Sequence, residues 1–179
     1  MKKLSESVWG DVRRRAEGHT ERREDDMTNI RDIVPLDMGC SVLWADRDLE
    51  WKNGSCYFNF DEATELVKKS EWRIPSKDEV FELFKKTRDI KRTDEVCVLV
   101  KVSDYSRRDY DDVIKIVFDK KGYVPGDSEH ILSKATYYSW TSTPTETAET
   151  YFANSIQQWQ YFAPMHDMNK PCVRLVKDK

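Results

Sequence analysis

The sequence lacks a long apolar run near its amino terminus. Met1 to Glu6 is mostly polar, and no apolar stretch follows it. A secretory signal needs roughly 7–15 consecutive apolar residues, and a membrane-spanning helix needs about 20. The sequence therefore predicts a protein that is made in the cytoplasm and is not inserted in a membrane.

A strong excess of charge of either sign is also missing. Lysine and arginine together number 30, and aspartate and glutamate number 33, so the formal net charge is -3 although 35% of the residues are charged. Proteins that bind nucleic acid through its phosphates carry a clear cationic excess. The near balance of charges therefore argues against nucleic acid as a partner.

Cysteine, histidine and glycine are few and scattered. The cysteines form no Cys-x-x-Cys pair and lie beside apolar or aromatic residues, which predicts buried free thiols and leaves disulfides as an alternative; they are Cys40, Cys56, Cys97 and Cys172. The three histidines fit no metal-binding pattern, and the six glycines form neither a phosphate-binding loop nor a Gly-x-Ser-x-Gly motif. We expect no enzymatic activity, no cofactor and no bound metal.

Residues 1–28 differ in composition from the rest of the chain, because charged side chains dominate and large apolar ones are rare. Leu4, Val8 and Val12 are spaced four apart and Trp9 is adjacent, so a helix places all four in one stripe. A helix of about a dozen residues is marginal in water by itself. The segment is predicted to be a docking helix followed by a charged tether. A disordered tail and packing on the chain's own domain are the alternatives.

Residues 29–179 have the apolar periodicity of one compact domain. Asp61 is expected to cap a first helix, and Ser76 with Glu79 has the capping-box spacing that opens a second helix. Short segments rich in β-branched and aromatic residues are expected to be strands: 42–45, 57–60, 96–102, 113–118, 137–143, 151–156, 159–163 and 172–176. This order predicts an α+β domain with two helices and a mostly antiparallel sheet.

Five blocks of this domain resemble a known family. In chain order they cover residues 36–46, 57–63, 72–79, 138–143 and 173–178, and the third block, Trp72-Arg73-Ile74-Pro75 with the four residues after it, is the most distinctive. Together they resemble the Fibrobacter succinogenes major paralogous domain family, which occurs in gut bacteria and their phages. The resemblance implies a C-type-lectin-like fold in which the first and last strands pair.

Two blocks contain large side chains for which a structural role is expected. Trp44 and Trp72 are large enough to fill the core of a small domain, and the planar guanidinium of Arg73 is expected to brace carboxylates or carbonyls. The enzymes of this fold family, the formylglycine-generating oxidases, use two cysteines late in the domain, whereas only Cys172 falls there. The calcium-binding motifs common in lectins of this fold do not occur either.

The amino-terminal segment carries a second resemblance. Residues 3–13 are similar to a leader shared by otherwise unrelated proteins of crAss-like and other tailed phages that infect gut Bacteroidales. This resemblance implies a virion accessory protein, found on the head fibre or tail, whose helix docks on a capsid or tail protein. The residues expected to make that contact are Leu4, Val8, Trp9, Val12 and Arg13.

A late stretch of the domain alternates amides with flat aromatic rings. Sugars stack on aromatic faces while amides bond their hydroxyl groups, so this mixture suits a glycan. The predicted ligand residues are Asn154, Gln158, Trp159, Tyr161 and His166. The alternative is that the aromatic residues belong to the core.

Together these patterns predict a virion protein that displays a lectin-like domain for attachment to a host-surface glycan or protein. The alternative is an intracellular bacterial module for protein–protein interaction. Association into a homo-oligomer is left open by the sequence.

Overall fold

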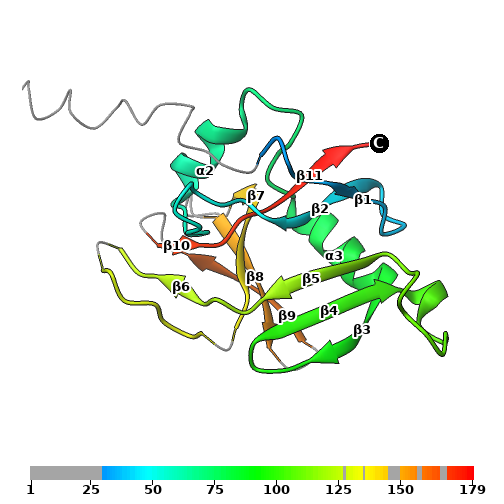
Figure 1. Cartoon of the computed structure of the whole chain (residues 1–179). Helices are drawn as coiled ribbons and strands as arrows, with labels where there is room; N and C mark the ends of the chain where they lie inside the picture. Colours follow the sequence, from blue (N-terminus) through cyan, green and yellow to red (C-terminus); the bar gives the residue numbers. More distant parts are fainter. Residues whose placement is uncertain (1–29, 127, 135, 145–149, 157–158, 166–168) are drawn as a thin grey trace, which may run out of the picture.

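The computed structural model describes the backbone of residues 30–126, 128–134, 136–144, 150–156, 159–165 and 169–179. The side chains of these residues are described as well, apart from those in the range 144–168. These residues form two α-helices, a short 3-10 helix and four small sheets, in which all pairs of strands are antiparallel (Figure 1). The predicted α+β class with mostly antiparallel strands is confirmed for this part of the chain.

The first sheet joins the two ends of the described domain. It has the order β1-β2-β11, formed by β1 (Pro35–Leu36), β2 (Val42–Asp48) and β11 (Arg174–Asp178). Strand β11 runs antiparallel to β2, so that Val42 pairs with Asp178 and Asp48 pairs with Arg174. Figure 1 shows the red β11 beside the blue β2. The first strand predicted from the sequence, at 42–45, therefore pairs with the last one, whereas the short β1, which was not predicted, pairs only with β2.

Both helices begin with a capping box. Ser76 caps α3 (Lys77–Lys86) and exchanges hydrogen bonds with Glu79, as the sequence predicts. Helix α2 (Phe60–Val67) begins earlier than predicted, because Asn59 is its cap and accepts a hydrogen bond from the Glu62 backbone N–H at 2.8 Å. The prediction of Asp61 as the cap was therefore wrong, and so was the strand at 57–60, since Phe60 is already helical.

A second sheet follows α3 directly. It consists of β3 (Thr87–Arg92), β4 (Val96–Lys101) and β5 (Lys115–Asp119) in that order, with a short 3-10 helix, η2 (Val102–Asp104), after β4. Strand β3 was not predicted, because its sequence is mostly charged and holds a single large apolar residue. The buried Thr87 starts it, and its hydroxyl donates to the Leu83 carbonyl at 2.8 Å.

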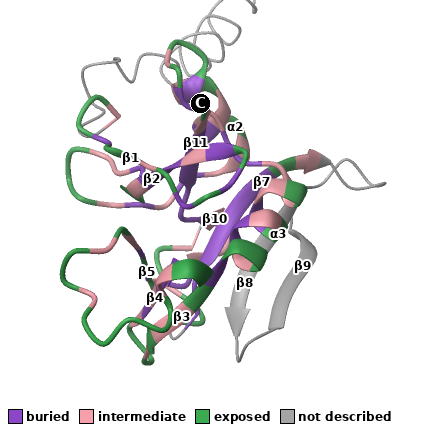
Figure 2. Ribbon diagram, turned by 90° about the vertical axis from the view of Figure 1, so that its right-hand side faces the viewer, coloured by how far each residue is buried: buried purple, intermediate pink, exposed green. Residues whose placement is uncertain are grey.

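The remaining strands make a third sheet and a short pair. The third sheet, in the order β7-β8-β9, contains β7 (Tyr138–Pro144), β8 (Thr150–Ile156) and β9 (Trp159–Met165). Helix α3 lies against β7 (Figure 2), and its backbone also approaches that of β8. The pair is formed by β6 (Tyr123–Val124) and β10 (Lys170–Pro171). Helix α3 also contributes Val80 and Leu83 to the core.

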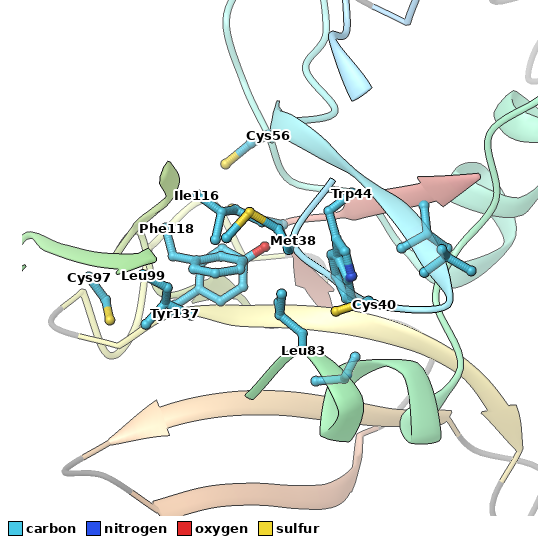
Figure 3. Close-up of a cluster of buried hydrophobic side chains, with 14 residues drawn as sticks. Met38, Cys40, Trp44, Cys56, Leu83, Cys97, Leu99, Ile116, Phe118 and Tyr137 are labelled. Carbon is cyan, nitrogen blue, oxygen red and sulfur yellow. The ribbon is translucent and has the colours of Figure 1, made fainter. Parts of the chain in front are cut away.

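Large aromatic side chains fill the core, as expected for two of them. Trp44 is 1% exposed and Trp72 is 4% exposed, so their predicted structural roles are confirmed. In Figure 3, Trp44 lies beside Cys40, and the rings of Phe118 and Tyr137 are in contact with centroids 4.8 Å apart. A second cluster is built around the fully buried Trp140, Phe58 and Leu175, and the two clusters meet across β2 and β11, which contribute residues to both.

Arg73 joins the most distinctive block of the sequence to the last strand. Its backbone exchanges hydrogen bonds with Val176 at 2.8 and 2.9 Å. Its guanidinium donates to both carboxylate oxygens of Glu79, at 2.6 and 2.8 Å, and to Asp178 at 3.0 Å. The predicted role of Arg73 as an internal brace is confirmed.

Candidate ligand-binding groove

A tight turn after β2 forms one wall of a surface groove. The Trp51 backbone N–H donates to the Ser55 carbonyl and the Gly54 N–H donates to the Trp51 carbonyl, each at 2.8 Å. Gly54 has a φ of +78°, a conformation that glycine adopts without steric cost. This turn holds the side chains of Trp51, Asn53 and Ser55 at the groove.

The ring of Trp51 is held in place from one side. It stacks on Phe58 with centroids 4.7 Å apart and an angle of 26° between the planes, and its Nε1 donates to the Tyr57 carbonyl at 3.2 Å. Phe58 is fully buried, so it anchors the indole to the core. Trp51 is half-buried and lines the groove, which leaves part of the indole accessible to a ligand.

The opposite wall comes from β6, β10 and the loop between β6 and β7. Val124 and Lys170 are paired residues of the two short strands, and Glu129 and Ile131 come from the loop. Tyr123 exchanges backbone hydrogen bonds with Leu132 at 2.8 and 3.1 Å, which closes this loop at its base. The groove has a volume of about 530 Å³, within the range of roughly 300–1,000 Å³ that is common for small-ligand sites.

The groove contains charged and neutral polar groups. Lys52, Lys170 and Glu129 line it, and neither Lys170 nor Glu129 has an ion-pair partner among the side chains that the structure describes. Burial raises the pKa of Tyr57, whose hydroxyl donates to the Lys121 carbonyl at 2.7 Å. Tyr57 is therefore neutral at physiological pH, and the charge of the groove comes from the lysines and the glutamate.

A buried ion pair supports the start of the turn. The guanidinium of Arg174 donates to Asp48 at 2.7 Å, to the Ala45 carbonyl at 3.1 Å and to the Val117 carbonyl at 2.6 Å. The Tyr137 hydroxyl donates to Asp48 at 2.9 Å. These bonds fix the end of β2, from which the groove turn leaves the sheet.

The four cysteines are free and buried, as predicted. Cys56 and Cys172 are neighbours behind the groove wall, and a hydrogen bond between their thiols, together with burial, raises the pKa of Cys172 well above its ordinary value. Burial raises the pKa of Cys40 to about 11. Thiols with such pKa values are protonated at neutral pH and are poor nucleophiles.

The predicted ligand residues are only partly described. Asn154 lies in β8 opposite Tyr161 of β9, and Trp159 is the first residue of β9, opposite Ile156. The backbone therefore brings Asn154 and Tyr161 together, whereas their side chains are outside the description. Gln158 and His166 also lie outside the described residues, and so do the predicted docking residues Leu4, Val8, Trp9, Val12 and Arg13.

The groove residues were not predicted as a site from the sequence. A local signal was present, because residues 51–57 combine two aromatic rings with an amide, a hydroxyl and a lysine. The opposite wall, including Lys170 and Glu129, is distant in the chain. The pairing of β6 with β10 assembles this wall, and the Phe58 N–H, which donates to the Pro171 carbonyl at 3.1 Å, joins it to the segment that follows the turn.

The comparisons with known proteins give no relative for this chain. No protein-family model, no curated protein and no solved structure matches it. In the described part of the chain, neither helix has the length and apolar character needed to cross a bilayer. The same residues contain no cluster of three or more histidine, cysteine, aspartate or glutamate side chains suited to a metal ion.

Proposed function

We propose that the chain is a non-enzymatic binding protein of a phage particle, with a C-type-lectin-like domain that attaches to a glycan of the host surface. Residues 1–28 are proposed to dock on a capsid or tail protein and to hold the domain outward. The observation that carries the proposal is the pairing of β2 with β11, which brings together the opening and closing blocks of the family resemblance.

The position of the third block supports the same proposal. Its Arg73 is hydrogen-bonded to Val176 of the closing block, and Trp72 lies under the ammonium of Lys177 at 5.2 Å. The fourth block, 138–143, lies in β7 and meets the closing block where the Ser139 hydroxyl accepts from the Arg174 N–H at 3.0 Å. Residues from blocks far apart in sequence thus contact one another, which is what a shared family core requires.

The chemistry of the buried cysteines supports a binding role over catalysis. Each of the four thiols is buried. Burial raises the pKa of Cys40 and Cys97, and the hydrogen bond with Cys56, together with burial, raises the pKa of Cys172. An activated cysteine needs the opposite environment, exposed and with a lowered pKa.

Two point variants test the two halves of the proposal separately. Trp9→Ala removes the largest apolar side chain of the docking segment, and we expect the variant to be missing from purified particles when these are analysed by mass spectrometry. Trp159→Ala leaves the docking segment intact, so it should be incorporated normally but should lose binding on a glycan array. Each variant serves as the control for the other, and circular dichroism checks that both are folded.

Two results contradict the proposal. Absence of the wild-type protein from purified particles removes the virion role and favours an intracellular interaction module. Normal incorporation of a chain that lacks residues 1–18 refutes docking through the amino-terminal segment.

A further inference from the structure

The groove beside Trp51 has an aromatic surface that is already in position. Phe58 supports the indole from one side, and the hydrogen bond from Nε1 to the Tyr57 carbonyl fixes its rotation. A rigid aromatic surface loses little conformational entropy when a ligand binds, which favours affinity. Such a surface suits the flat, partly apolar face of a sugar ring.

The second feature is an amine without a counter-ion. Lys170 is half-buried in the groove and has no hydrogen-bond or ion-pair partner among the described side chains. A partly desolvated ammonium interacts more strongly with an anion than an exposed one does, because solvent screens it less. With Lys52 on the other wall, the groove carries two positive charges against the one negative charge of Glu129, although the whole chain has a net charge of -3.

Small polar groups complete the lining. Asn53 and Ser55 are next to Trp51 and present an amide and a hydroxyl, which suit the hydroxyl groups of a sugar. A volume of about 530 Å³ accommodates a small ligand rather than a folded partner. The ligand that matches an aromatic face, amide and hydroxyl groups and an excess of positive charge is a sugar with a carboxylate.

We propose that this groove binds an acidic saccharide, with the sugar ring on Trp51 and its carboxylate at Lys170. The inference rests on the proposed glycan-binding function and deepens it, because it names the class of glycan and adds the groove residues to the predicted ligand residues.

Isothermal titration calorimetry of the full chain with three probes tests the inference. The probes are digalacturonate, its dimethyl ester and neutral digalactose, which share a ring structure and differ in charge. We expect digalacturonate to bind at least about tenfold more tightly than the ester or the neutral sugar, which corresponds to about 1.4 kcal/mol.

Charge variants then locate the site. Lys170→Gln should weaken digalacturonate binding by about tenfold and leave the weak binding of the ester unchanged. Glu129→Gln removes a repelling charge and should strengthen binding by a few fold. Lys115→Gln is the matched control, because Lys115 is another half-buried lysine and lies on β5 outside the groove. It should bind like the wild type.

The outcomes separate this inference from the function it rests on. Equal binding of the acid and the ester, unchanged binding by Lys170→Gln, or weaker binding by Glu129→Gln overturns the acidic-saccharide site. Binding of digalacturonate that is lost in Trp159→Ala but kept in Lys170→Gln also overturns it, while the proposed attachment function stands. If no glycan binds and the protein is absent from particles, both fail.

Discussion

The buried ion pair between Arg174 and Asp48 yields the strongest prediction for stability. Both side chains are 3% exposed, and Nε of Arg174 lies 2.7 Å from the Asp48 carboxylate. Asp48→Asn keeps the shape of the side chain and removes its negative charge. Arg174 then retains its bonds to the Ala45 and Val117 carbonyls, but its positive charge is buried without an opposite charge. Loss of one partner of a buried pair costs about 3–5 kcal/mol.

A domain of this kind has a total unfolding free energy of about 5–15 kcal/mol, so the expected loss is a large fraction of it. Urea unfolding followed by tryptophan fluorescence measures the change. Glu65→Gln is the control, because it breaks the ion pair with Lys68, in which both side chains are more than half exposed, and it should cost less than about 1 kcal/mol.

A double variant distinguishes lost charge balance from lost packing. Asp48→Leu with Arg174→Met replaces both charges by apolar groups, and buried pairs replaced in this way are often close to neutral. The double variant should therefore be more stable than Asp48→Asn alone. A cost below about 1 kcal/mol for Asp48→Asn, or a double variant that is no more stable, refutes this reasoning.

Three further predictions concern the backbone, pH and the thiols. Gly122→Ala should lower the unfolding free energy by at least about 3 kcal/mol, because Gly122 has a φ of +70° and an added Cβ would lie 2.0 Å from the Leu132 carbonyl oxygen. Gly54 has a similar φ but open space around it, so Gly54→Ala should cost only about 1–2 kcal/mol. Urea unfolding measures both changes. Burial raises the pKa of Glu79, but hydrogen bonds from Arg73 and its other partners outweigh this and hold the pKa below the usual 4.5. The ionised Glu79 stabilises the fold fully above pH 4.5, and this stabilisation is lost as the pH falls through the lowered pKa. The unfolding free energy of Glu79→Gln should therefore decline less than that of the wild type between about pH 5 and pH 3, and an equal decline in the two proteins contradicts this. The four thiols should react with a disulfide reagent at about pH 8 only after unfolding, and rapid reaction in the native protein would be the opposite result.

Prediction from the sequence was most accurate for segments whose residue pattern fits only one type of structure. The spacing of Ser76 and Glu79 located the start of α3, and the β-branched run of β4 identified a central strand. Arg73 could be recognised as a brace because its planar guanidinium can donate to several carboxylate oxygens at once, as it does to Glu79 and Asp178. Side chains with a single favourable environment were therefore predicted correctly.

It failed where a local pattern was weak or ambiguous. The segment 57–60 has the aromatic content of a strand, but Asn59 caps a helix that begins at Phe60. Strand β3 has no apolar periodicity and is held by its pairing with β4. The groove forms because Lys170 lies near the turn at Trp51, and no local sequence pattern predicts that two residues so far apart in the chain line one groove.

The antiparallel register of β2 and β11 also determines where a reporter group can be attached. Val42 pairs with Asp178, next to the carboxyl terminus, while Asp48 at the other end of the strand leads into Trp51. A strand rises about 3.4 Å per residue, so Val42 and its partner Asp178 are separated by roughly 20 Å from Asp48, where β2 ends before the turn. A fluorescent dye or a sensor-chip linker joined to Lys179 therefore leaves the indole open to solution.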